Sequence, residues 1–149
     1  MSAKTAVAEA SLPNVRVAEG MASSRSWCPM DEEGNFQLKV LSLDWERKSV
    51  EALFKVKGGY RSGAHKHTCE THVFIVSGKV QNHTIGCTFT EGDYCYQPFD
   101  DVHDEEFVED TIAYVSYRGK SDTMVEFLDS NGEVCGEFKL NDFENAMSV

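Results

Sequence analysis

Short strand patterns, separated by turn residues, recur through most of this chain from Phe36 onward. We expect strands at 36–41, 50–57, 73–76, 94–96 and 111–117, because these runs alternate apolar and polar residues or are rich in β-branched and aromatic side chains. Asn131-Gly132 is a strong hairpin signal. Strands at this spacing predict an all-β sandwich or barrel.

The 149 residues are enough for one domain with a sizeable core. We expect a single domain over 1–149, with an arm and loop at 1–30, a barrel at 36–140 and a short helix at 141–147. The arm is small and polar, so we expect it to pack only in an oligomer. Because barrels of this kind have edge strands, we expect a homodimer or homotetramer.

A net charge of −11 and the lack of clustered lysine or arginine argue against nucleic acid and anionic membranes as partners. The sequence has no run of 18 or more apolar residues, so we expect no membrane span. It also has no apolar core near its start, so we expect no secretory signal. The five cysteines form no CxxC pair, so we expect free thiols and a cytoplasmic protein. The acidic run 104–106 is interpreted as a solvated face.

Histidines gather in two segments, Gly59-x5-His65-Lys66-His67-x4-His72-x5-Gly78 and Gly92-x5-Pro98-x4-His103. His65 and His67 are two residues apart, so on an extended strand both rings point to one face. His103 can then meet them from a second strand. Several convergent imidazoles suit Fe, Ni, Cu or Zn better than Mg or Ca. The sequence therefore predicts one divalent metal ion.

These segments resemble the two motifs of the cupin superfamily, Gly-x5-His-x-His-x3/4-Glu-x6-Gly and Gly-x5-Pro-x-Gly-x2-His-x3-Asn. The chain departs from these motifs at four positions. His72 stands at the position of the motif's Glu, and Gly78 comes one residue earlier than the motif's closing Gly. Asp100 replaces the Gly of the second motif, and Phe107 replaces its Asn. The resemblance implies a jelly-roll barrel (a double-stranded β-helix). It is strongest to small single-domain cupins of the acetylacetone dioxygenase and ChrR-like group, which the stretch 127–134 also resembles. That group holds Fe(II) with three histidines.

From these motifs we expect His65, His67 and His103 to bind the metal, with His72 as a fourth ligand or a buried neighbour of the site. Glu70 could instead supply a carboxylate, and Cys69 a thiolate, although a loop residue and a small buried residue are their plainer interpretations. His83 is expected to be exposed. Four further residues are candidates for the wall of a substrate pocket: Arg61, Tyr94, Tyr96 and Phe99.

The resemblance implies an Fe(II)-dependent dioxygenase that cleaves a β-dicarbonyl or related ketone, a small-molecule substrate. Replacing the usual carboxylate with imidazole leaves a divalent site at charge +2, which favours an anionic chelate such as an enolate. Two alternatives remain. One is a non-redox isomerase, hydrolase or lyase that uses Zn, Ni or Mn. The other is a non-enzymatic metal-binding sensor of the ChrR type, for which we see no helical partner-binding segment.

Overall fold

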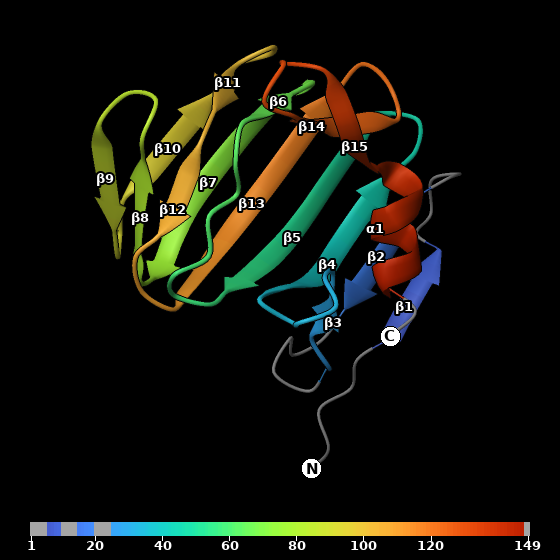
Figure 1. The fold of residues 1–149 in the computed structure, drawn as a ribbon. Helices are drawn as coiled ribbons and strands as arrows, with labels where there is room; N and C mark the ends of the chain where they lie inside the picture. Colours follow the sequence, from blue (N-terminus) through green and yellow to red (C-terminus); the bar gives the residue numbers. More distant parts are fainter. Residues whose placement is uncertain (1–5, 10–14, 20–24, 148–149) are drawn as a thin grey trace.

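The computed structural model describes residues 6–9, 15–19 and 25–147. The strands pair antiparallel, and the largest sheet has the order β1-β2-β4-β5-β13-β7-β10, with β3 paired to β4 (Figure 1). The strands of this sheet are β1 (Ala6–Glu9), β2 (Val15–Glu19), β3 (Cys28–Pro29), β4 (Phe36–Asp44), β5 (Ser49–Val56), β7 (Cys69–Ser77), β10 (Tyr94–Gln97) and β13 (Thr111–Gly119).

Two smaller sheets lie against the large one. One has the order β11-β6-β14-β15, with β6 (His65–His67), β11 (Val102–His103), β14 (Thr123–Leu128) and β15 (Val134–Lys139). The other has the order β12-β8-β9, with β8 (Lys79–Asn82), β9 (Cys87–Thr90) and β12 (Glu105–Phe107). The all-β prediction is confirmed. Within the described ranges the ladders form a jelly roll but do not close into one hydrogen-bonded barrel.

The five predicted strands correspond to β4, β5, β7, β10 and β13. β5 begins and ends one residue earlier than predicted, and the other four strands are longer than predicted. The hairpin predicted at Asn131-Gly132 joins β14 to β15, and Gly132 has a φ of +79°. The predicted C-terminal helix is present as α1 (Leu140–Met147). It packs beside β4 with four buried side chains: Leu140, Phe143, Ala146 and Met147 (Figure 1).

Strand alternation determines which side chains face the interior. In β13, Thr111, Ala113, Val115 and Tyr117 are buried and line the space between the sheets, whereas Tyr114 is exposed on the outer face. This is the period of two expected for a strand with one face on a core.

Gly78, in the turn between β7 and β8, shows why the first histidine segment ends on glycine. Its φ is +104°, and a Cβ there would lie 2.5 Å from the carbonyl oxygen of Asp110 and would also overlap Thr111. Only glycine combines this backbone angle with so close an approach.

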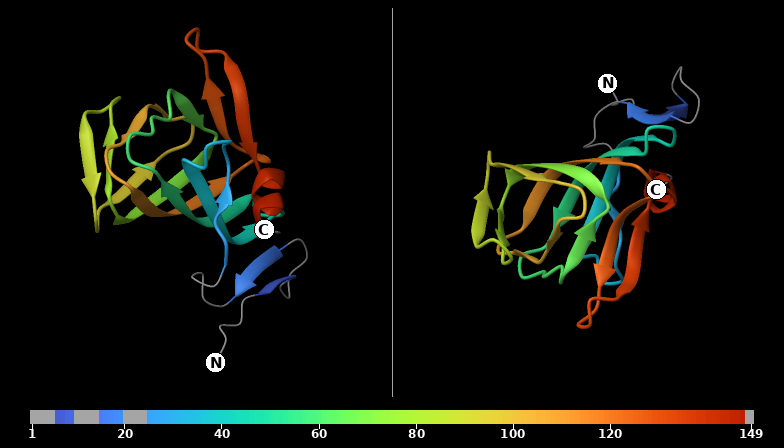
Figure 2. Two further views of the ribbon diagram at one scale, coloured as in Figure 1. Left: turned by 60° about the horizontal axis from the view of Figure 1, so that its bottom comes forward. Right: turned by 90° about the horizontal axis from the view of Figure 1, so that it is seen from above.

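The N-terminal segment packs within its own chain. β2 pairs antiparallel with β4, with Val15 opposite Asp44, and β1 pairs with β2. Figure 2 shows both strands at the end of the molecule away from β8 and β9. The expectation that the arm packs only in an oligomer was therefore wrong for 6–9 and 15–19. The rest of the expected arm, 1–5, 10–14 and 20–24, lies outside the described residues.

The described part of the chain contains no helix that is long and apolar enough to cross a membrane.

Candidate metal centre

Three buried histidines converge where β6 meets β11. β6 carries His65 and His67 on one face, and β11 pairs antiparallel with it so that His103 stands opposite His65. One ring nitrogen from each histidine lies within 4.8 Å of the other two. Their exposed fractions are 6%, 4% and 1%. The sequence prediction that these three residues meet agrees with this geometry.

Hydrogen bonds at Nδ1 aim the rings of His65 and His67. Nδ1 of His65 donates to the carbonyl oxygen of Gly63 at 2.9 Å, so its Nε2 carries the free lone pair. Nδ1 of His67 lies 2.9 Å from the Thr71 hydroxyl, and its Nε2 faces Nε2 of His103. Outer partners of this kind fix ring orientation in metal sites.

The spacing of the nitrogens fits one transition-metal ion. Nε2 of His67 and Nε2 of His103 are 2.9 Å apart. Two imidazoles bound at right angles to one ion, with bonds of about 2.0–2.1 Å, would place their nitrogens roughly 3 Å apart. The donor set is also of the type that Fe, Zn, Ni and Cu prefer.

The pKa values of the three histidines are shifted in different directions. Burial, with the nearby His103, lowers the pKa of His65, and burial with both neighbouring histidines lowers the pKa of His67 well below its usual value. Burial also acts to lower the pKa of His103, but Glu105 and Asp101 outweigh it and the pKa is raised. At neutral pH His65 and His67 are therefore neutral and can donate lone pairs to an ion.

Glu105 on β12 reaches the same cluster. Its Oε1 lies 3.1 Å from Nε2 of His103 and 3.7 Å from Nε2 of His65. The expectation that this residue lies on a solvent-exposed face was wrong, because its side chain is only 18% exposed. Glu105 is two residues after His103, and in extended chain such residues point to the same face. This spacing could have predicted that Glu105 lies beside the histidines.

His72 lies outside the cluster, so the expectation of a fourth histidine ligand was wrong. It lies on the outer face of β7, where its Nε2 donates to Glu70 at 2.7 Å and its Nδ1 is 2.5 Å from the Tyr94 hydroxyl. Both ring nitrogens are occupied by these partners. Glu70 is thereby held away from the three histidines as well.

The four candidates for the pocket wall also lie elsewhere. Tyr94 and Tyr96 are 56% and 49% exposed on the outer face of β10, because the inward positions of that strand are Cys95 and Gln97. Arg61 is exposed and pairs with Asp104 at 2.8 Å. Phe99 lies outside the cavity, under the Lys120 ammonium group.

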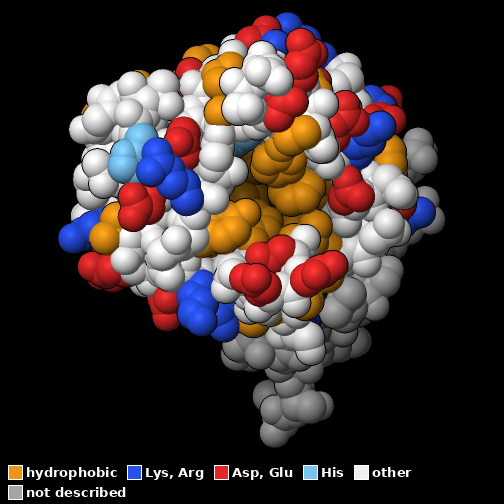
Figure 3. Space-filling model, in the orientation of Figure 1, with side chains coloured by type: hydrophobic (Ala, Val, Ile, Leu, Met, Phe, Trp, Pro, Cys, Tyr) orange, Lys and Arg blue, Asp and Glu red, His pale blue; other side chains and the backbone are white. Residues whose placement is uncertain are grey.

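The interior instead forms a cavity that opens beside the histidines. The cavity between the sheets has a volume of about 100 Å³. Figure 3 shows hydrophobic side chains gathered in this hollow, with charged groups around it. Six phenylalanines line it: Phe36, Phe54, Phe89, Phe107, Phe127 and Phe138. The polar lining includes His65, His67, Glu105 and Gln97, whose Oε1 is buried and accepts no hydrogen bond from the described residues.

Cys69 is buried beside Thr71, and its Sγ is 3.3 Å from the Met124 carbonyl oxygen. Burial raises the pKa of its thiol to about 11. It stays protonated at neutral pH and does not join the histidine cluster, so a thiolate ligand is not supported. The five cysteines are free, as expected. His83 is exposed, as expected, and pairs with Glu106 at 2.8 Å.

One substitution in the second histidine motif falls on a residue with a left-handed backbone. Asp100, which stands where the cupin motif has glycine, has a φ of +66°. Aspartate tolerates this left-handed conformation better than most residues. Asp100 therefore adopts, before His103, a conformation that glycine also favours.

Comparison with known proteins supports the cupin assignment. Residues 18–122 match the family described as the ChrR cupin-like domain. The DNA damage-repair/toleration protein DRT102 of Arabidopsis thaliana is 26% identical over 110 residues, which are 71% of this chain and 34% of that protein. The chain thus spans about a third of the length of this curated relative.

Solved structures share the fold. A candidate acetylacetone dioxygenase from Methylibium petroleiphilum PM1 has a TM-score of 0.76 at 21% identity, covering 98% of this chain and 99% of that one. An acetylacetone dioxygenase from Acinetobacter johnsonii has a TM-score of 0.71 at 20% identity, covering 82% and 85%. At these identities the likeness concerns the jelly-roll fold.

Proposed function

This chain belongs to the family of ChrR cupin-like domains, and on that premise we propose that it is an Fe(II)-dependent dioxygenase for a small β-dicarbonyl or related ketone. His65, His67 and His103 would hold one ion through their Nε2 atoms. The observation that carries the proposal is a buried cluster of three imidazoles beside an apolar cavity.

An ion bound by three histidines would keep coordination positions for a substrate that binds through two oxygens. A bound Fe(II) ion supplies Lewis acidity to those oxygens and electrons for reaction with O₂. The protein's own task is to orient the histidines, through Gly63 and Thr71, and to keep bulk water from the reacting atoms.

The cavity wall suits a ligand with an apolar body and a polar head. Its phenylalanines would surround the body, and the head would face the histidines. Two buried polar groups could orient such a head. Gln97 offers an unpartnered acceptor oxygen. Burial raises the pKa of Tyr117 well above its usual value, so its hydroxyl stays protonated and can donate a hydrogen bond.

The test is oxygen uptake by protein loaded anaerobically with Fe(II), measured with a panel of β-diketones and hydroxyketones. We expect uptake with at least one diketone, together with a new visible absorbance band when the diketone is added without O₂. His83→Ala should behave as the wild type, because this histidine pairs with Glu106 outside the cluster. No uptake and no absorbance change with any diketone would favour the non-redox alternative with Zn, Ni or Mn.

We also propose that the protein forms a homodimer or homotetramer. Exposed apolar side chains on the outer faces of β7 and β10 support this, among them Phe74, Tyr94 and Tyr96, since such patches are commonly covered by partners. Light scattering at micromolar concentration should give more than one chain's mass of 16.7 kDa. A monomer under these conditions would contradict the proposal.

A further inference from the structure

The carboxylate of Glu105 stands at the histidine cluster although no cupin motif position provides it. We infer that Glu105 is a fourth protein ligand of the metal, so that the carboxylate of this centre comes from β12 and not from the first histidine motif. This inference rests on the proposed metal centre.

The distance from Glu105 to His103 is that between neighbouring ligands of one ion, and the distance to His65 is slightly longer. Oε1 of Glu105 is 3.1 Å from Nε2 of His103 and 3.7 Å from Nε2 of His65. Ligands with bonds of about 2.0–2.2 Å in octahedral or tetrahedral geometry are roughly 3–3.5 Å apart. The glutamate oxygen thus completes a cluster in which three nitrogens already lie within 4.8 Å of one another.

The backbone of Glu105 is fixed on both sides, which keeps its side chain directed inward. Its N–H donates to Oγ of Ser62 at 3.0 Å, and its carbonyl accepts from the N–H of Ser62 at 2.9 Å. On its other edge it pairs with Asn82 of β8. A ligand on a strand anchored in this way loses little conformational freedom when it binds an ion.

The two acidic neighbours of Glu105 are engaged elsewhere. Asp104 pairs with Arg61 at 2.8 Å, and Glu106 bonds His83 at 2.8 Å. Only the middle residue of this run lines the cavity. Glu105 is therefore the one carboxylate of this run that can reach the histidines, whereas Asp104 and Glu106 form ion pairs outside the cavity.

The usual carboxylate position offers no competitor. Thr71 and His72 stand where the motif has glutamate, and Glu70 is held on the outer face by His72. With Glu105 bound, three neutral histidines and one carboxylate leave a divalent site at charge +1. A singly charged enolate would then bring the net charge of the centre to zero. The site should therefore prefer substrates that bind as monoanions.

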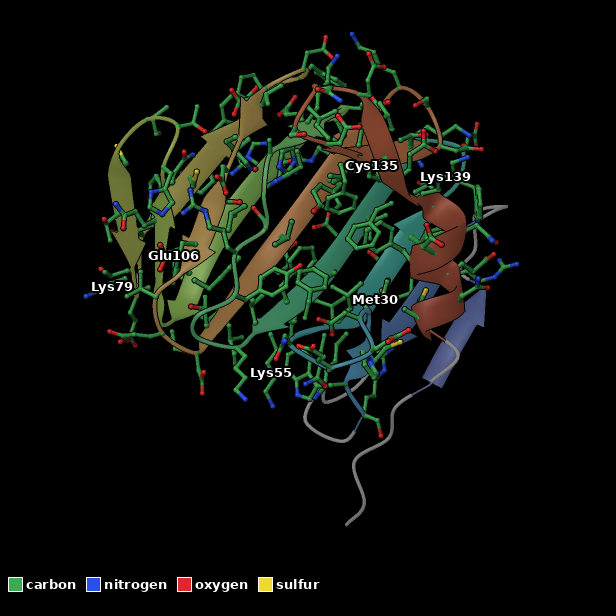
Figure 4. The ribbon with its side chains drawn as sticks, viewed as in Figure 1. Met30, Lys55, Lys79, Glu106, Cys135 and Lys139 are labelled. Atoms are coloured by element: carbon green, nitrogen blue, oxygen red, sulfur yellow. The ribbon has the colours of Figure 1, made fainter. Side chains whose placement is uncertain are left out.

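The experiment uses Co(II) as a probe of ligand number, because its visible bands change when a ligand is lost. Metal-free wild type, Glu105→Gln and Glu106→Gln are titrated with Co(II) alone, and affinities are measured by competition with a chelator. Glu106→Gln is the matched control, since it removes the same charge from the adjacent residue, which lies beside β8 at the outside of the molecule (Figure 4).

We expect Glu105→Gln to weaken Co(II) binding by about 100-fold or more and to shift the visible bands, because loss of an outer partner alone already costs about 10–100-fold. Glu106→Gln should match the wild type in both readouts. Unchanged bands would overturn the inference whatever the affinity, because a group acting only through its charge leaves the ligand set intact. Wild type that binds no Co(II) would instead overturn the metal centre itself.

Glu105→Asp serves as a second variant if the glutamine form is poorly folded. It keeps the charge but shortens the side chain by one methylene, so direct ligation predicts weaker binding and altered bands. Affinity and bands equal to those of the wild type would contradict ligation.

Discussion

The Thr71 hydroxyl oxygen lies 2.9 Å from Nδ1 of His67, and this contact ties β7 of the large sheet to the strand that carries two of the three histidines. Thr71 is 1% exposed, so the contact is shielded from bulk solvent. The hydroxyl therefore sets the orientation of the His67 ring, with Nε2 toward His103.

Thr71→Val should weaken metal binding by about 10–100-fold while leaving the fold intact, because it removes the ring's partner and conserves the shape of the side chain. Chelator competition measures this loss. Thr68→Val is the control: its hydroxyl bonds the carbonyl oxygen of Thr123 and not a histidine. Equal affinities for wild type and Thr71→Val would show that the contact does not matter for the metal.

His72→Ala should keep metal affinity within about threefold of the wild type, since the ring bonds Tyr94 and Glu70 on the outer face. We expect a loss of stability of only about 0.5–1 kcal/mol, as for other partly exposed sites. Metal analysis and thermal unfolding measure the two effects. Loss of the metal in this variant would restore His72 as a ligand.

Cys69 should resist alkylation by iodoacetamide at pH 8 in the folded protein, because burial excludes the reagent and a pKa of about 11 leaves almost no thiolate. Cys87 and Cys135 are exposed and should react first; Cys135 is labelled in Figure 4. Mass spectrometry of peptides follows each site over time. Equal rates at Cys69 and Cys135 would contradict the buried position.

The main strands and the three converging histidines could be predicted from the sequence. Both depend on the alternation of side chains along short segments, which the sequence shows directly. It misplaced His72 because β7 carries apolar residues on both faces. Phe74 and Val76, which share its face, are 45% and 43% exposed, whereas Val73 and Ile75 line the cavity. With apolar residues on both faces, alternation no longer reveals the inward side.

Other features depend on contacts between distant segments. The pairing of β2 with β4 joins a weakly patterned segment to a strand more than 20 residues away, and no local signal announces it. Tyr94, Tyr96 and Phe99 were expected to line the pocket because aromatic residues often do. The cavity is lined by phenylalanines from several other strands, which only the fold brings together.

The central claim is a single metal centre built on His65, His67 and His103, and metal stoichiometry in a double variant tests it most directly. Metal-free wild type incubated anaerobically with one equivalent of Fe(II) should retain about one ion per chain after desalting. His65→Ala combined with His103→Ala should retain almost none, because two of the three imidazole ligands are gone. Full occupancy in the folded double variant would contradict the account.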